Sequence, residues 1–290
     1  MAGPVSVLPP LEHPPSRPRL TPLSLAVFPR LATAALDLVF PALCAVCEAR
    51  LGPRRRDPLC GPCWDAIDRI APPFCDRCGG PCATPGSAMG GLDERGWGMG
   101  SSDVGSPERG PVSHPLTCAR CAAEPPPYDY ARSAAVYAGV MREAVHRFKF
   151  GGRRALARPL AELMVEQCGT SLPDGIAAIV PVPLAGDRER ERGFNQAALL
   201  AERIARRLDV PVRARWLARR RATRPQSDLP AGERLANVRG AFRATPAVAG
   251  RHVLLVDDVL TTGATLAECA RSLRAAGAGR IGVLTVARVR

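Results

Sequence analysis

The stretch between residues 252 and 276 constrains the fold of this chain more than any other. Residues 252–256 (HVLLV) form a continuous apolar run, which is typical of a strand buried on both faces. A turn rich in threonine and glycine follows, and residues 264–276 carry the apolar periodicity of a helix. Parallel strands need a crossover connection, and a helix usually supplies it. The C-terminal part of the chain is therefore predicted to be α/β.

The same alternation of strands and helices begins near residue 130. Strands are expected at 133–137, 176–182 and 281–287, and helices at 139–150, about 155–167 and about 194–207. The segment 213–243 is basic and rich in loop residues. This order predicts a parallel sheet with helices on both faces. The ligand site of such a sheet is expected at the carboxyl ends of its strands.

Eight of the 11 cysteines form four C-x-x-C pairs. Taken in order they make two sets of four, namely Cys44, Cys47, Cys60 and Cys63, then Cys75, Cys78, Cys118 and Cys121. Four thiolates close a tetrahedral zinc site without an open position, so each set predicts a structural Zn²⁺. An interleaved pairing, Cys82 or His114 as a substitute ligand, and reduced thiols without metal are the alternatives. Cys168 and Cys269, both in expected helices, are predicted to be small buried apolar residues.

The charge of the chain indicates its partners, and its proline- and glycine-rich segments suggest how the 290 residues divide. The formal charge of +13 and a pI near 9.9 favour phosphate-bearing partners such as nucleotides, phosphosugars or nucleic acid. Four segments are expected: a disordered tail at 1–22, a cysteine-rich module at 23–121 that contains a flexible insertion at 83–117, a proline linker at 122–129, and an α/β domain at 130–290.

Residues 23–43 are apolar but do not fit a signal peptide or a membrane span. Pro29, Arg30, Asp37 and Pro41 interrupt the run, which leaves fewer than the roughly 18 uncharged residues that a span requires. A short amphipathic helix is expected there. Paired thiols that bind metal suit a reducing compartment, so a cytoplasmic protein without a membrane partner is predicted.

The strongest chemical signal directly follows the apolar run 253–256. Asp257 and Asp258 come first, and a turn of five residues then opens the helix: Thr261, Thr262, Gly263, Ala264 and Thr265. Backbone N–H groups at a helix start, supplemented by hydroxyls, bind a phosphate dianion. Two carboxylates beside them suit a sugar diol and a hydrated Mg²⁺. A simple capped turn is the alternative, which the full string in an α/β context disfavours.

Residues 253–265 resemble the phosphoribosyl-diphosphate (PRPP) signature of type I phosphoribosyltransferases. Four more stretches make the chain similar to the ComF family of competence-type phosphoribosyltransferase-like proteins: LDLVFPALCAVC at 36–47, HRFKFGGRRALARPLAELM at 146–164, VPVPLAGDRERERGFNQAALLA at 180–201 and TRPQSDLPAGERLANVRGAF at 223–242. The resemblance covers about 35–82 and 116–290. It implies a type I phosphoribosyltransferase-like parallel sheet preceded by a small double zinc-ribbon module, with two structural Zn²⁺ and with Mg²⁺ bound together with PRPP.

The resemblance also implies roles for residues. Asp257 and Asp258 would hold the ribose hydroxyls, and residues 261–265 the 5′-phosphate. The turn after the 176–182 strand, with Val182 and Pro183, matches the diphosphate loop. Arginines of the run 188–192 would supply charge to the leaving diphosphate, and a solvated charged run is the alternative: Arg188, Arg190 and Arg192.

Further polar residues lie in segments whose role is less defined. A loop-rich stretch that could fold over bound PRPP contains Arg224, Gln226, Arg234, Asn237 and Arg239. His146 and Lys149 lie on an expected helix and are predicted to be surface or packing residues.

Two functions remain compatible with these patterns. One is a Mg²⁺-dependent enzyme that transfers ribose 5-phosphate from PRPP, or a related phosphosugar, to a nitrogenous acceptor. The other is a non-catalytic accessory protein in DNA uptake or processing that binds nucleic acid or a DNA-handling partner. Trp64, Trp97 and Trp216 are scattered, which disfavours a stacking platform for single-stranded DNA.

Overall fold

The computed structural model describes residues 42–52, 57–82, 116–221, 223 and 230–290. The chain divides into two units, Met1–Ala42 and Leu43–Arg290. The tail expected at 1–22, nearly all of the helix expected within 23–43, and residues 83–115 of the expected insertion lie outside the described residues. The same holds for His114, Arg224 and Gln226.

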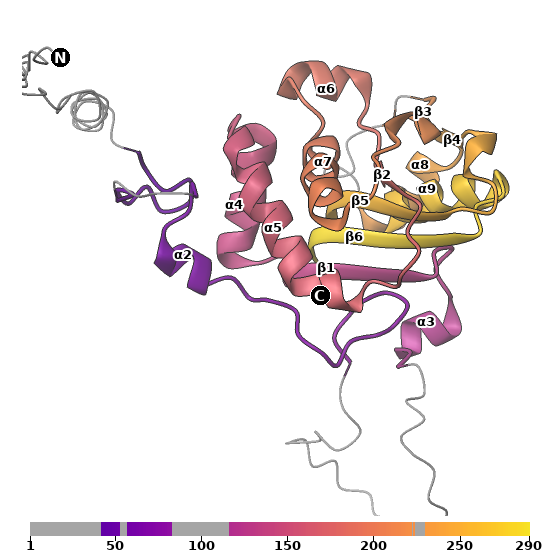
Figure 1. Ribbon diagram of the computed structural model, residues 1–290, viewed down its shortest axis with the longest axis horizontal. Helices are drawn as coiled ribbons and strands as arrows, with labels where there is room; N and C mark the ends of the chain where they lie inside the picture. Colours follow the sequence, from indigo (N-terminus) through magenta and orange to yellow (C-terminus); the bar gives the residue numbers. More distant parts are fainter. Residues whose placement is uncertain (1–41, 53–56, 83–115, 222, 224–229) are drawn as a thin grey trace, which may run out of the picture. The chain divides into compact units, whose positions relative to one another are not determined.

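A four-stranded sheet, in the order β1-β6-β5-β2, forms the centre of the second unit (Figure 1). Its strands are β1 (Tyr130–Val136), β2 (Ala178–Pro181), β5 (His252–Leu260) and β6 (Arg280–Arg288). Every neighbouring pair is parallel, with β5 and β6 in register from His252 opposite Arg280 to Leu260 opposite Arg288. The predicted parallel α/β sheet is confirmed.

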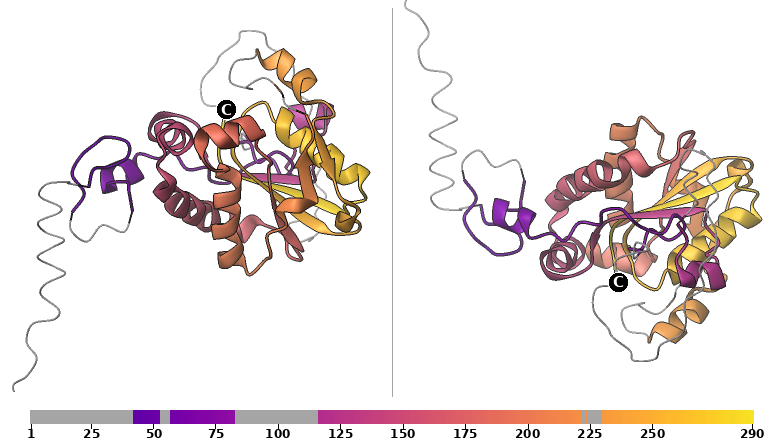
Figure 2. Two further views of the ribbon diagram at one scale, coloured as in Figure 1. Left: turned by 90° about the horizontal axis from the view of Figure 1, so that it is seen from above. Right: turned by 90° about the horizontal axis from the view of Figure 1, so that it is seen from below.

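Helices cover both faces of this sheet (Figure 2). One face packs against α4 (Gly139–Phe150), α5 (Ala157–Cys168) and α7 (Gln196–Leu208), and the other packs against α9 (Ala264–Ala275). Successive side chains of a strand point to opposite faces, so Leu254 and Val256 join the first core, whereas Val253 and Leu255 join the second. A strand that fills two cores must be apolar throughout, which explains the run that the sequence shows.

Several elements differ from the sequence-based expectation. β1 begins at Tyr130 and β5 continues to Leu260, because both strands keep pairing with β6 beyond their most apolar residues. The basic segment 213–243 contains an antiparallel pair, β3 (Leu217–Arg219) and β4 (Phe242–Ala244), and the helix α8 (Ala231–Val238). The remaining elements are the helices α2 (Gly61–Asp65), α3 (Ala119–Ala123) and α6 (Gly186–Arg192), and the 3₁₀ turns Arg154–Leu156, Gly169–Ser171, Ala214–Trp216 and Pro246–Val248.

The charged run that contains Arg188, Arg190 and Arg192 forms the helix α6, most of whose residues are exposed. Acidic residues lie in its first turn and basic residues in its last turn, which is the arrangement that the helix dipole favours. Gly193 ends the helix at φ +73°, a left-handed conformation that glycine adopts without steric cost. The order of charges and the terminal glycine therefore stabilise a helix here.

The cysteine-rich segment covers the exposed edge of the sheet. The N–H of Ile70 donates to the carbonyl of Ala134 at 3.0 Å, and the N–H of Val136 donates to that of Asp68 at 2.8 Å. Arg69 and Ala135 form an antiparallel bridge. Residues 68–70 thus pair with β1, whose backbone groups would otherwise be open to pairing with another chain.

No helix among the described residues is both long and apolar enough to cross a bilayer.

The first prediction concerns the core of α4. Phe148 is fully buried and packs against Phe194, with ring centroids 5.7 Å apart. Phe148→Ala should lower the free energy of unfolding by about 3–5 kcal/mol, because it removes apolar contacts and leaves a cavity. Urea denaturation followed by circular dichroism measures this loss.

Phe150 lies on the same helix but is 56% exposed, so Phe150→Ala is the matched control. Its cost should stay below about 1 kcal/mol. Equal losses for the two variants would contradict the assigned core.

Candidate functional site

Two carboxylates lie near the carboxyl end of β5. Asp258 is only 7% exposed, and its Oδ1 lies 2.8 Å from Nζ of Lys149 on α4. Oδ1 of Asp257 accepts the N–H of Asp258 at 2.9 Å. The sequence suggested that the two acids follow the end of the strand. The structure shows that β5 continues to Leu260, so both acids belong to the paired strand.

Lys149, expected to be a surface or packing residue, is largely buried and pairs with Asp258 of this candidate site. Burial alone would lower the pKa of Lys149, but the adjacent Asp258 carboxylate outweighs burial and raises it. Lys149 is the only lysine among 40 basic residues, a signal that could have singled it out.

The pKa of Asp257 depends on burial and on several neighbouring charges. Burial, together with the neighbouring Asp258 carboxylate, raises the pKa of Asp257 to about 7 against the opposing effect of Lys149. Arg192 is also close enough to lower the pKa of Asp257. The site therefore combines two carboxylates with two fixed cations.

A glycine–threonine loop follows β5 and opens α9. Gly263 has φ +81°, which only glycine adopts readily, and α9 begins at the next residue. Oγ1 of Thr262 accepts the N–H of Ala264 at 3.4 Å. The first N–H groups of a helix have no partner within the helix, so this loop offers donors to an anion.

The turn after β2 lies beside this strand end. The N–H of Val182 donates to the carbonyl of Val256 at 3.0 Å, and Nδ2 of Asn195 donates to the carbonyl of Val182 at 3.1 Å. Oδ1 of Asn195 also caps α7 by accepting the N–H of Ala197 at 3.0 Å. Asn195 therefore holds the Val182–Pro183 turn against the start of α7, a link that sequence analysis missed although a polar residue before a helix is a usual cap.

Two of the three arginines expected near the diphosphate lie on the same side of α6. Arg188 and Arg192 lie one helical turn apart on α6 and are half-buried, whereas Arg190 is exposed. The guanidinium of Arg192 lies over the ring of Phe150, 4.6 Å from its centroid, and donates to Oε1 of Gln196 at 3.1 Å. Its Nε is buried and finds no hydrogen-bond partner among the described residues. Nη2 of Arg188 donates to the carbonyl of Thr223 at 3.3 Å.

The residues expected to fold over the ligand are only partly described. Arg234 and Asn237 lie on α8, and Arg239 directly follows it. The carbonyls of Asn237 and Arg239 each accept a hydrogen bond from Nη2 of Arg221 at 2.9 Å.

The eight paired cysteines gather into the two consecutive sets. Within each set the four sulfur atoms lie within 4.8 Å of one another. Sγ of Cys47 and Cys60 are 3.5 Å apart, and those of Cys78 and Cys118 are 3.8 Å apart. A tetrahedral zinc with bonds of about 2.3 Å places its sulfurs about 3.8 Å apart, whereas a disulfide bond is about 2.05 Å long. The geometry fits four-coordinate zinc and excludes disulfides between these pairs.

The same backbone contact recurs in both sets. The N–H of Cys60 donates to Sγ of Cys44, and the N–H of Cys118 to Sγ of Cys75, each at 3.4 Å. Burial opposes ionisation, but backbone N–H donors outweigh it and lower the pKa of Cys44 to about 6 and that of Cys75 to about 7. Thiolates are the form that binds a metal.

The three other cysteines lie outside both sets. Sγ of Cys82 is 3.8 Å from the carbonyl of Gly80, which places it near the second set but not in it. Cys168 and Cys269 are buried in helices, as expected.

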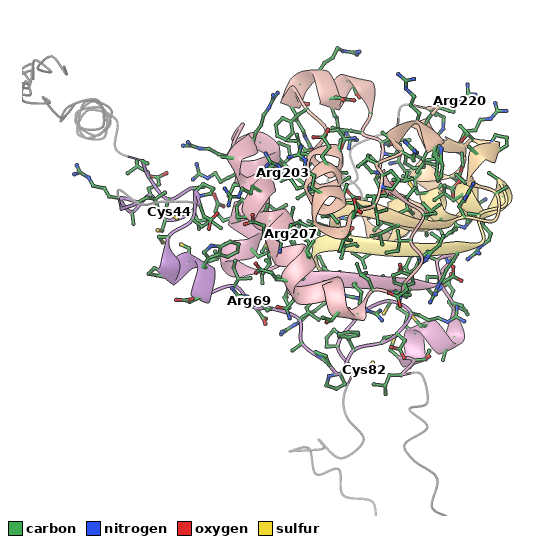
Figure 3. The ribbon with its side chains drawn as sticks, viewed as in Figure 1. Cys44, Arg69, Cys82, Arg203, Arg207 and Arg220 are labelled. Carbon is green, nitrogen blue, oxygen red and sulfur yellow. The ribbon has the colours of Figure 1, made fainter. Side chains whose placement is uncertain are left out.

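The second cysteine set lies against the glycine–threonine loop. Arg120, between Cys118 and Cys121 on α3, donates through Nη2 to the carbonyl of Thr262 at 3.4 Å. Arg288, at the end of β6, donates to the carbonyl of Cys78. The first set packs near α4 instead, where Glu48 pairs with Arg147 at 3.7 Å. Figure 3 shows Cys44 of the first set well apart from Cys82, which follows Cys78.

Two family models match the chain. A double zinc ribbon domain matches residues 35–92, and a phosphoribosyl transferase domain matches residues 195–290. The latter begins at Asn195 and includes the two acids and the loop of the site.

The chain is similar to several bacterial proteins. The DNA utilization protein YhgH of Escherichia coli (strain K12) is 38% identical over 186 residues, which are 61% of this chain and 81% of the relative. Competence protein F of Haemophilus influenzae is 34% identical over 181 residues, or 59% and 78% of the two chains. Competence protein ComFC of Bacillus subtilis is 35% identical over 142 residues, or 49% and 57%.

Among solved structures, orotate phosphoribosyltransferase from Aeropyrum pernix matches 48% of this chain and 75% of its own, with 19% identity and a TM-score of 0.30. The family follows from the coverage and identity of the relatives and from the two family models. A double zinc ribbon joined to a phosphoribosyltransferase-like domain, in a chain 38% identical to its relative in E. coli, makes this protein a member of the ComF family.

Proposed function

We propose that the protein binds PRPP together with Mg²⁺ and transfers its phosphoribosyl group to a nitrogenous acceptor. The observation that carries this proposal is the pair of carboxylates on β5 next to a glycine–threonine loop at the start of α9. Carboxylates that bind a diol, next to a loop that binds an anion, match the hydroxyls and the phosphate of a ribose 5-phosphate.

Each part of the site has a chemical task in this proposal. The N–H groups of residues 262–265 bind the 5′-phosphate, and Asp257 and Asp258 accept hydrogen bonds from the ribose hydroxyls. Arg188 and Arg192, with the turn at Val182 and Pro183, face the diphosphate. The protein's contribution to the rate is then to position the reactants and to stabilise the departing charge.

The donor set fits a magnesium ion that arrives with the diphosphate. One oxygen of each carboxylate already has a partner within the protein, which leaves one oxygen of each for a ligand or a hydrated ion. Mg²⁺ usually keeps several waters and takes one or two carboxylates plus substrate phosphates. When bound, the ion supplies charge neutralisation to the leaving diphosphate.

The two cysteine sets are proposed to hold one structural Zn²⁺ each. All four positions of each tetrahedron would be protein sulfur, so neither ion would have room for substrate. Small metal sites of this type take much of their folding free energy from the metal.

A second candidate function is favoured by the relatives, which are named for DNA utilization and competence. Exposed arginines such as Arg203 and Arg207 on α7 and Arg220 after β3 could meet a phosphate backbone (Figure 3). In this function the basic surface would bind DNA, and the PRPP site would serve as a sensor or carry a separate activity.

The metal content tests the zinc proposal. Purified protein should contain about two Zn²⁺ per chain, one for each cysteine set. Cys75→Ser with Cys78→Ser should reduce this to about one, because two of four ligands are lost. Elemental analysis of the dialysed protein is the measurement.

Cys82→Ser is the control, since Cys82 belongs to neither set, and its zinc content should equal that of the wild type. Protein without zinc and with all thiols titratable in the native state would contradict the assignment.

The PRPP proposal is tested by Asp257→Asn with Asp258→Asn. Each lost charge-assisted hydrogen bond is worth about 1.5–3 kcal/mol, so affinity for Mg²⁺-PRPP should fall at least about a hundredfold. Thr262→Val should weaken binding less, because the backbone donors remain. Isothermal titration calorimetry gives the affinities, and zinc content and circular dichroism check the fold.

The matched control removes two carboxylates from the surface. Asp65→Asn with Asp209→Asn changes the net charge equally at two exposed positions and should leave PRPP affinity unchanged. The proposal is wrong if the Asp257 and Asp258 double variant binds as tightly as this control.

The DNA-handling function makes a different prediction. Affinity for single-stranded DNA should fall steeply between about 50 and 200 mM salt, and Arg203→Ala with Arg207→Ala should reduce it, because phosphate contacts release counterions. The double asparagine variant should bind DNA as the wild type does. Fluorescence anisotropy measures both, and binding that is absent even at the lower salt concentration would exclude this function.

A further inference from the structure

We infer that Lys149 supplies, from within the protein, the cation that the two carboxylates of the site require, so the ribose 5-phosphate end of the ligand binds without a metal ion on Asp257 or Asp258. This inference rests on the proposed function. It adds a residue that positions the carboxylates, and it separates the part of the ligand that needs Mg²⁺ from the part that does not.

The geometry places Lys149 firmly in the site. Its Nζ lies 2.8 Å from Oδ1 of Asp258, and the side chains of Lys149 and Asp258 are 21% and 10% exposed. The preceding residue, Phe148, is fully buried in the core under α4, so the helix cannot easily move the ammonium away. The contact is therefore a shielded ion pair and not a solvated surface pair.

The charges of the site balance without a metal. Asp257, whose pKa is raised to about 7, and Asp258 contribute at most two negative charges, whereas Lys149 and Arg192 contribute two positive ones. Without Lys149, a 5′-phosphate dianion in the neighbouring loop would face two carboxylates with only one compensating cation. Like charges in a partly buried site disfavour each other much more strongly than in water.

The choice of lysine in this chain also points to a specific need. The other 39 basic residues are all arginine, whose planar fork is broad and always charged. Arg192, the arginine whose charge acts on Asp257, is stacked over Phe150, the residue after Lys149, at 4.6 Å from the ring centroid. At 2.8 Å from Oδ1 of Asp258, the ammonium acts as a compact point charge, which the planar guanidinium fork of an arginine does not reproduce.

Lys149 and Mg²⁺ therefore act on different parts of the ligand. The diphosphate of PRPP carries a high charge and takes Mg²⁺ with it, whereas the ribose and its 5′-phosphate meet a site that is already neutral. Ribose 5-phosphate, which lacks the diphosphate, therefore isolates the part of the ligand on which Lys149 acts.

Titration with ribose 5-phosphate tests the inference. Calorimetry is performed on the zinc-loaded protein in buffers that either contain a Mg²⁺ salt or have been freed of divalent cations by passage over a chelating resin before the protein is added. Wild-type protein should bind equally in both buffers. Lys149→Met should bind at least about tenfold more weakly without Mg²⁺, because a charge-assisted hydrogen bond to Asp258 is lost and the carboxylate is uncompensated. Added Mg²⁺ should restore part of this loss, since the carboxylates then take up a cation.

Arg147→Met is the matched control. It removes the same charge from the same helix, two residues earlier, but Arg147 pairs with Glu143 and Glu48 away from the carboxylates. Its affinity for ribose 5-phosphate should stay within about twofold of the wild type, because surface pairs contribute little.

Two further variants protect the test from a folding defect. Lys149→Arg keeps the charge, so it should bind more weakly than the wild type yet remain independent of Mg²⁺. In an Asp258→Asn background, Lys149→Met should change the affinity less than in the wild type, because the pair is already broken. Thermal unfolding and zinc content confirm that each variant is folded.

The outcomes separate this inference from the proposed function. If wild-type protein binds neither ribose 5-phosphate nor Mg²⁺-PRPP, the proposed function fails and this inference fails with it. If the wild type binds both but needs Mg²⁺ for ribose 5-phosphate, or if Lys149→Met equals the wild type without Mg²⁺, only the role of Lys149 is overturned.

Discussion

The site depends on an electrostatic compensation at the end of β5. This strand is buried between two helical layers, yet it carries two adjacent carboxylates that lose most of their contact with water. Burying an unpaired carboxylate is costly, and the ion pair between Lys149 and Asp258 offsets that cost. The position of α4 is therefore tied to the position of the carboxylates.

The cysteine-rich segment contacts both the sheet and the loop of the candidate site. Residues 68–70 pair with the edge of the sheet, and the second cysteine set holds α3, from which Arg120 reaches the carbonyl of Thr262. This hydrogen bond fixes the carbonyl of Thr262 within the loop that opens α9. The second cysteine set thus contacts the glycine–threonine loop, whereas the first lies beside α4, where Glu48 pairs with Arg147.

Local patterns predicted a large part of this arrangement. The apolar run of β5, the loop after it and the two cysteine sets are short-range signals, because burial on both faces and metal geometry dictate residue type at fixed spacing. The helix α6, the β3–β4 pair and the place of Lys149 escaped prediction. A run of alternating acids and arginines has no apolar stripe, and a strand of three residues has too little periodicity. A lysine between a buried and an exposed phenylalanine carries no sign of the strand that it meets in space.

The central claim is that one phosphosugar site is formed by the end of β5, the start of α9 and α4. A crystal structure of the zinc-loaded protein with PRPP and Mg²⁺ tests it most directly. The account predicts the 5′-phosphate within hydrogen-bonding distance of the N–H groups of residues 262–265, the ribose hydroxyls on Asp257 and Asp258, and Lys149 still bound to Asp258. A PRPP molecule held elsewhere on the protein, with these carboxylates free of it, would contradict the account.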